Sequence, residues 1–205
     1  VMEDTIVDVK FSGMSWKANA GFFYSSYDKP KGSELSAKTD QHKLYYHKLG
    51  TSQDNDEVIF GGTPEEKHRY VGGSVTEDNR FLIISASKST SGNQLFIKDL
   101  IKETSKLIPV MDNYESDVSV LDNEGDRIIM YTNYEAPNGR IVSATFPNLS
   151  PENWIEVIPE TENVLSPSTG GGYIVAEYMV DAISQVKQFD KTGKLLWDNS
   201  FEIND

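Results

Sequence analysis

The chain has 205 residues, of which 38% are hydrophobic and 11% aromatic, enough for a packed core and unlike a disordered chain. Its net charge of −13, from 32 acidic and 19 basic residues, gives a surface that repels nucleic acid and anionic membranes. No run approaches the ~20 apolar residues of a membrane span. The absence of cysteine excludes disulfides and thiolate metal sites, and it leaves both the cytoplasm and a bacterial periplasm open as compartments.

The first part of the chain predicts a sheet of four short strands interrupted by a polar segment. Residues 1–9 are short and acidic, and they fit either a loop or the outer strand of a preceding sheet. The segment Asp28–Gln41, rich in Ser, Lys and Asp, is expected to leave the sheet as a loop that is mobile or contacts a partner. The predicted strands are Phe11–Trp16, Gly21–Ser26, Lys43–Leu49 and Val58–Phe60.

The rest of the chain repeats this plan three times, with polar turns between alternating or apolar strands. The turn Thr76–Asn79 holds the place in the second repeat that Asp122–Gly125 holds in the third. The second repeat has strands at Tyr70–Val75, Arg80–Ala86, Gln94–Leu100 and Lys106–Met111. The third has Asp117–Leu121, Arg127–Asn133, Arg140–Phe146 and Trp154–Ile158, and the fourth has Val164–Ser166, Tyr173–Tyr178, Gln185–Phe189 and Lys194–Trp197.

Recurrence of one four-stranded antiparallel unit predicts an all-β fold, a β-propeller with about four blades. The repeats begin about 40–50 residues apart, the period expected for four-stranded blades. The blades are placed at approximately residues 10–62, 69–113, 115–160 and 162–203, with no linker long enough to divide the chain.

Several long motifs closely resemble the β-propeller of prolyl oligopeptidases, in the expected order along essentially the whole chain. They are Lys10-Phe-Ser-Gly-Met-Ser-Trp16, Gly21-Phe-Phe-Tyr-Ser-Ser-Tyr27, the segment Thr39–Thr51, Tyr131-Thr-Asn-Tyr-Glu-Ala-Pro-Asn-Gly-Arg-Ile-Val142 and Trp154-Ile-Glu-Val-Ile-Pro-Glu160. The resemblance implies four middle blades of a seven-bladed ring. In that family the ring caps an α/β-hydrolase domain and admits only short peptides to the serine peptidase site.

The sequence itself offers no catalytic centre. A nucleophile elbow of the Gly-x-Ser-x-Gly type is needed, yet the sequences around Ser15 and Ser74 lack the second glycine and no amphipathic helix follows either one. We therefore expect the hydrolase domain to be absent and the chain alone to be non-catalytic. Gly170–Gly172 is predicted to form a turn and not a phosphate-binding loop, because no Gly-Lys-Ser/Thr sequence follows it.

No cofactor or metal is implied by the remaining polar residues. His42 and His47 have an odd spacing across one strand and so cannot share its face, and His68 lies in a polar loop. Acidic pairs such as Glu65-Glu66 fit solvated turns better than a shared acid–base pocket.

The resemblance implies a substrate pocket on the propeller. Phe11 matches an aromatic residue that lines the pocket for a peptide residue upstream of the scissile proline, and Val71 matches an apolar residue of that pocket. The loop Ser87–Gly92 matches another lining segment, with Ser89 or Thr90 as its candidates. The residues alone favour a core role for Phe11 and Val71, because apolar residues at strand starts are commonly just buried.

Two classes of function stand against each other at this point. The first is a gating propeller of a post-proline serine endopeptidase, with short proline-containing peptides and its own hydrolase domain as partners. The second is a stand-alone propeller that binds other proteins, and a propeller lectin or sugar-acid enzyme ranks well below both. If the chain is a fragment of the larger ring, its four blades leave open sheet edges, through which we expect the isolated chain to associate or to close imperfectly.

Overall fold

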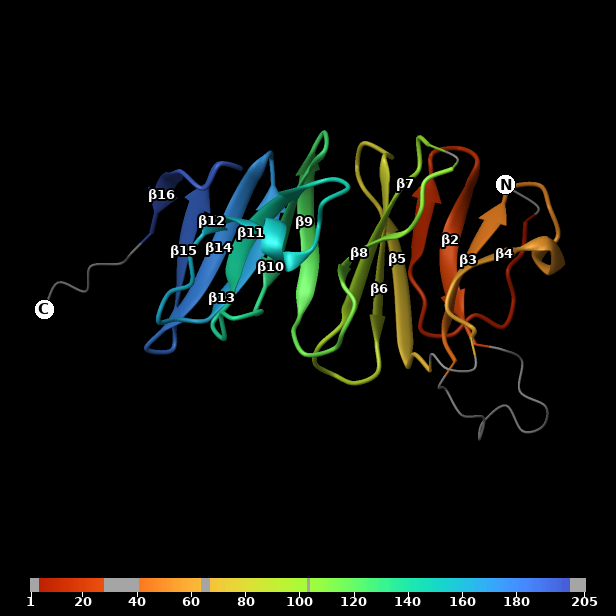
Figure 1. Ribbon diagram of the computed structural model, residues 1–205, viewed down its shortest axis with the longest axis horizontal. Helices are drawn as coiled ribbons and strands as arrows, with labels where there is room; N and C mark the ends of the chain where they lie inside the picture. Colours follow the sequence, from red (N-terminus) through yellow and green to blue (C-terminus); the bar gives the residue numbers. More distant parts are fainter. Residues whose placement is uncertain (1–3, 28–40, 64–66, 103, 200–205) are drawn as a thin grey trace, which may run out of the picture. The chain divides into compact units, whose positions relative to one another are not determined.

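The computed structural model describes residues 4–27, 41–63, 67–102 and 104–199, and these form four antiparallel sheets of four strands each (Figure 1). In every sheet the strands are hydrogen-bonded in the order in which they follow one another in the sequence. The prediction of an all-β fold built from about four four-stranded units is therefore confirmed. The predicted excursion Asp28–Gln41 lies outside the described residues except for Gln41.

The chain divides into two compact units, Val1–Tyr114 (unit 1) and Glu115–Asp205 (unit 2). Unit 1 holds β1 (Met14–Lys17), β2 (Gly21–Ser26), β3 (Lys43–Lys48), β4 (Glu57–Phe60), β5 (Tyr70–Val75), β6 (Phe81–Ser87), β7 (Gln94–Asp99) and β8 (Ile108–Met111). Unit 2 holds β9 (Val118–Glu124), β10 (Arg127–Thr132), β11 (Arg140–Thr145), β12 (Ile155–Ile158), β13 (Leu165–Gly170), β14 (Tyr173–Val180), β15 (Ile183–Phe189) and β16 (Leu195–Asp198). Two short 3₁₀ turns, η1 (Gln53–Asn55) and η2 (Pro151–Asn153), precede the outer strands β4 and β12.

The N-terminal segment differs from the prediction. The first strand begins at Met14 instead of Phe11, and residues 4–13 form no strand. Asp8 and Phe11 have φ values of 59° and 55°, in the left-handed region, so the chain turns here and cannot pair with β2. The hydroxyl oxygen of Ser12 accepts the N–H of Ser25 at 2.7 Å and replaces the strand partner at this point.

The fourth sheet has longer strands and tighter turns than predicted. Gly170 ends β13, so that only Gly171 and Gly172, with φ of 59° and 83°, form the turn to β14. Asp181 and Ala182 make an equally tight turn between β14 and β15, with φ of 49° and 63°. Two consecutive positive φ values are the signature of hairpin turns that match the twist of paired strands.

The core of unit 1 lies between its two sheets. Alternate residues of β6 and β7 are buried, as expected for strands with one face against a neighbouring layer. Side chains from both sheets meet in one cluster, formed by Phe23, Leu44, Val71, Leu82, Ile84 and Ala86. Leu44, Leu82 and Ile84 are fully inaccessible to solvent.

Unit 2 is built in the same way. Its core cluster combines residues of both sheets, namely Ile129, Ile141, Ile158, Leu165, Ile174, Ala176 and Tyr178. β10 is buried along most of its length, in keeping with its continuous apolar run.

The pairing of the third and fourth strands is irregular in every sheet. In the first three sheets the register shifts between the second and third residues of the third strand, at Leu44/Tyr45, Leu95/Phe96 and Ile141/Val142. In the fourth sheet the shift lies at Gln188/Phe189, near the end of β15. The part of the chain that the structure describes contains no helix with the length and hydropathy of a membrane span.

Candidate functional site

An exposed group of aromatic rings lies at the start of the first sheet in unit 1. Phe11 keeps 60% of its surface exposed, although it is a large apolar residue. Its ring meets Tyr27 and Tyr70 edge-on, with centroid distances of 6.4 and 5.9 Å. We call Phe11, Tyr27 and Tyr70 the aromatic cluster. Rings that meet edge-on and stay partly exposed offer apolar area to a ligand side chain.

The backbone that carries Phe11 is held in a conformation that bulky residues rarely adopt. A left-handed φ at a phenylalanine is an outlier, and such conformations persist where surrounding contacts fix them. Here the Ser26 hydroxyl donates to the carbonyl of Asp8 at 3.0 Å, and the Tyr27 hydroxyl donates to the carbonyl of Arg69 at 2.6 Å. The outward position of Phe11 is therefore imposed by several contacts.

His42 connects this turn with the second sheet. It is 1% exposed and precedes β3. Its Nδ1 accepts the N–H of Val71 at 2.8 Å, and its Nε2 lies 3.2 Å from the carbonyl of Lys10. Burial lowers the pKa of His42, and the hydrogen bond to Lys10 opposes this effect only in part. The neutral imidazole is thus the form that suits the site.

The other candidates lie close to this turn but differ in exposure. Val71 is 2% exposed, and its side chain belongs to the core cluster of unit 1. Ser89 and Thr90 are exposed in the loop between β6 and β7. This loop follows Ser87, which pairs with Tyr70, so it begins at the end of the second sheet that carries Tyr70. Phe11 and Tyr70 are in contact, and the loop lies at the same sheet end as Tyr70.

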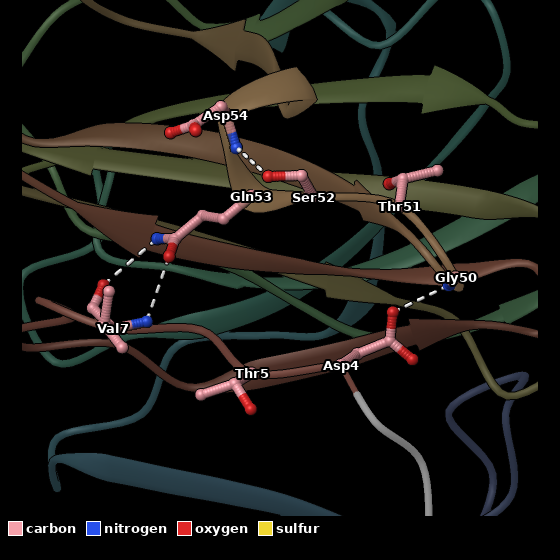
Figure 2. Close-up of a pocket in the computed structure, with 8 residues that line it drawn as sticks. All are labelled: Asp4, Thr5, Val7, Gly50, Thr51, Ser52, Gln53 and Asp54. Carbon is pink, nitrogen blue, oxygen red and sulfur yellow. Dashed lines mark hydrogen bonds between the residues drawn. The ribbon is translucent and has the colours of Figure 1, made fainter.

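A polar hollow of about 510 Å³ lies elsewhere in unit 1, between the N-terminal segment and the loop before β4 (Figure 2). The Gln53 side chain binds both backbone groups of Val7 at 3.0 Å, and Asp4 accepts the N–H of Gly50 at 2.7 Å (Figure 2). The walls offer mainly oxygen and amide groups and few apolar side chains, so this hollow does not suit the side chain of an apolar peptide residue.

Behind this hollow, His47 lies between two carboxylates. It is fully buried, with Nδ1 2.8 Å from Asp56 and Nε2 3.3 Å from Asp4. The hydrogen bonds from Gly50 and His47 lower the pKa of Asp4. Tyr24 donates to the second oxygen of Asp56 at 2.8 Å, and burial together with this bond raises the pKa of Tyr24. The arrangement fixes the N-terminal segment to the first sheet.

The three histidines bind separate partners. His68 is also fully buried, with Nε2 3.2 Å from the side-chain oxygen of Gln94, so the prediction of a polar loop understated its packing. Phe60 and Tyr114 lie beside its ring, at 5.3 and 6.5 Å between centroids. Among the described residues, no group of three or more His, Cys, Asp or Glu side chains is arranged to hold a metal ion.

Sequence reasoning missed Tyr27, Tyr70 and the connecting role of His42. Each residue lies in a different segment. Tyr27 and His42 follow β2 and precede β3 in the first sheet, and the packing of β5 beside this sheet brings Tyr70 to Phe11. The one local sign is the density of aromatic residues and histidine around these strand ends, a pattern that core residues also produce.

Comparison with known proteins agrees with this architecture. Residues 1–204 match the family model described as the prolyl oligopeptidase N-terminal β-propeller domain. Prolyl endopeptidases of Elizabethkingia miricola and Elizabethkingia meningoseptica are each 52% identical over 196 residues, which is 95% of this chain and 28% of theirs. The chain thus spans little more than a quarter of the length of these relatives.

Solved structures give the same result. One from a study of two prolyl endopeptidases superimposes with a TM-score of 0.84 at 28% identity, covering 98% of this chain and 29% of the other. Prolyl oligopeptidase B of Galerina marginata, bound to a 35-residue substrate, superimposes with a TM-score of 0.83 at 23% identity over 97% of this chain and 28% of its own, which supports the fold. The chain belongs to the prolyl oligopeptidase family and forms part of its N-terminal β-propeller domain.

Proposed function

We propose that this chain is the substrate-gating part of a post-proline serine endopeptidase that hydrolyses short peptides. Cleavage itself is assigned to an α/β-hydrolase domain outside these 205 residues. The observation that carries the proposal is the aromatic cluster, because Phe11 is held exposed by its backbone in a propeller whose relatives are prolyl endopeptidases.

In this proposal the propeller contributes selection by size and by side chain. Rigid four-stranded sheets exclude folded proteins, while an extended peptide passes and presents an apolar residue to the aromatic cluster. Val71 supports the wall from the core through its backbone, and Ser89 and Thr90 offer hydroxyl groups at the same end of the second sheet as Tyr70.

The direct test compares hydrolysis of a fluorogenic Gly-Pro peptide by the 205-residue chain and by the product of its complete reading frame. We expect activity in the longer product alone. Absence of activity in both would reject the peptidase assignment and favour a propeller that binds other proteins.

A second test addresses the pocket. Phe11→Ala in the longer product should raise KM about tenfold for a peptide with an apolar residue upstream of proline, since a filled apolar contact contributes ~1–3 kcal/mol. The matched control is Trp197→Ala, which removes an aromatic residue of similar exposure (52%) outside the aromatic cluster. Equal KM values for the two variants would refute the pocket.

The isolated chain is further proposed to associate through an open sheet edge. The edge strand β16 is exposed at all four residues, and three of them are Leu195, Leu196 and Trp197. An exposed apolar edge strand pairs readily with other chains. Light scattering should show assemblies that Leu196→Lys disperses, whereas a monodisperse monomer with one sharp melting transition would contradict the proposal.

A further inference from the structure

His42 is the buried side chain that joins the turn bearing Phe11 to the second sheet of unit 1. The backbone N–H of Val71 belongs to β5, the first strand of that sheet, and points away from β6 toward the imidazole. The carbonyl of Lys10, directly before Phe11, lies on the other ring nitrogen. The His42 ring thus binds the backbone N–H of Val71 at the edge of the second sheet and the backbone carbonyl of Lys10 in the turn before the first sheet.

These two contacts determine the protonation state that the ring needs. Nδ1 must carry a lone pair to accept the N–H of Val71, so the proton lies on Nε2 and is donated to Lys10. A doubly protonated ring would set Nδ1–H against the N–H of Val71 and break that contact. The structure therefore requires a neutral ring with one defined tautomer.

The groups around His42 do not favour an additional positive charge. The ring of Tyr27 lies 4.3 Å away at 33°, and that of Tyr70 meets it edge-on at 6.5 Å. The ammonium group of Lys10 lies over Phe11 at 5.4 Å, and the guanidinium group of Arg69 lies over Tyr70 at 5.4 Å. The turn also contains Asp8. Its side chain is a carboxylate, and its backbone carbonyl accepts the hydroxyl of Ser26.

We propose that His42 is a positioning residue for peptide recognition: its neutral ring ties Lys10 to Val71 and so holds Phe11 toward the bound peptide. This inference rests on the proposed function for the identity of the ligand. It assigns to His42 no contact with the reacting bond. Its effect is therefore expected in KM for peptides that use the aromatic cluster, and kcat should not change.

Three substitutions separate the two contacts from ring packing. Phenylalanine keeps the ring against Tyr27 but removes both hydrogen bonds. Asparagine places an oxygen where Nδ1 lies and keeps the acceptor for Val71, and glutamine places an N–H near Nε2 and keeps the donor to Lys10. The matched control is His68→Phe, which removes a buried histidine of the same unit that binds Gln94.

The experiment uses the product of the complete reading frame and two fluorogenic peptides, Phe-Gly-Pro and Gly-Gly-Pro. His42→Phe should raise KM about fivefold for the first peptide only, within the range of an apolar specificity contact, and His68→Phe should leave the ratio of the two KM values unchanged. Lowering the pH from 8 to about 5.5 should raise the ratio of KM for Phe-Gly-Pro to KM for Gly-Gly-Pro in the unaltered protein but not in His42→Asn, in which position 42 cannot titrate. A ratio unchanged by His42→Phe would overturn the inference.

Amide exchange of Val71 separates this inference from the peptidase assignment. Protection of that amide should fall at least about tenfold in His42→Phe and remain in His42→Asn, because only the second variant keeps an acceptor. If neither peptide is cleaved by the unaltered protein, the proposed function fails while lost protection still supports the positioning role. Unchanged protection in His42→Phe would refute that role whatever the enzyme assay gives.

Discussion

The contact between Leu44 and Gly73 allows a sharp test of how the two sheets of unit 1 pack. Leu44, in β3, is fully buried in the core cluster. A methyl group added at Gly73, in β5, would lie 2.6 and 2.7 Å from the two terminal carbons of Leu44. The absence of a side chain at Gly73 thus provides the space for Leu44, and the two positions should be strongly coupled.

Three variants measure how strongly Leu44 and Gly73 are coupled in the free energy of unfolding. Leu44→Ala should lower the free energy of unfolding by about 3 kcal/mol, from lost burial and the remaining cavity. Gly73→Ala should lower it by about 1 kcal/mol, because overpacking outweighs the lower chain entropy of the unfolded state. In the double variant the new methyl group lies in the cavity, so the total loss should be about 2 kcal/mol instead of about 4.

Urea denaturation followed by both tryptophan fluorescence and circular dichroism measures these values. Leu196→Ala is the control, since that leucine is 46% exposed and lies in unit 2, and it should add to Gly73→Ala without coupling. If the effects of Leu44→Ala and Gly73→Ala add to within about 0.5 kcal/mol, the packing described for these sheets is refuted.

Three further predictions concern pH and turns. Burial lowers the pKa of His42 below its usual 6.5 in the folded protein, so the unfolded chain takes up the proton first as the pH falls. The stability that His42 contributes above pH ~6.5 is therefore lost as the pH is lowered toward the pKa of the folded protein. The melting temperature of His42→Asn should decrease less between pH 7.5 and 5.5 than that of the unaltered protein. Ala182→Gly should stabilise the chain by about 0.5–1 kcal/mol in urea denaturation, because Ala182 has a φ of 63° that glycine adopts without strain. A lower stability of this variant would contradict the turn geometry. Hydrogen bonds from the Thr192 hydroxyl and from nearby backbone N–H groups lower the pKa of Asp190. Thr192→Val should therefore raise the pKa of the Asp190 carboxylate in an NMR titration. An unchanged pKa would exclude the hydroxyl contact.

Repetition in the sequence was sufficient to predict the sheets. Predicted strands such as Gln94–Leu100 and Arg140–Phe146 show a local pattern of apolar residues that is sufficient to identify a strand. The ends of both observed strands lie within one residue of the predicted ends. The tightness of the turn between β14 and β15 was missed because Asp181 and Ala182 adopt positive φ without the glycine that normally marks such turns.

The site was predictable only in part. Phe11 could be singled out through a family resemblance, but the strand assigned to it begins only at Met14, because contacts with Ser25, Ser26 and His42 hold the preceding residues in a turn. These contacts join segments separated by 13 to 32 residues, and no local pattern in the sequence reports them. His42 was considered only as a possible metal ligand, because its two partners are backbone groups and backbone groups carry no sequence signal.

The sequential order of strands within each sheet has a consequence for how the protein folds. Every hydrogen-bonded strand pair among the described residues joins neighbours along the chain, so most connections are short, and the one between β2 and β3 (residues 27–42) is longer. Native contacts of low sequence separation form quickly, and domains are made from the N-terminus during synthesis. Because the core of unit 1 is shared by its two sheets, β1–β4 and β5–β8 can assemble together while the segments of unit 2 are still on the ribosome.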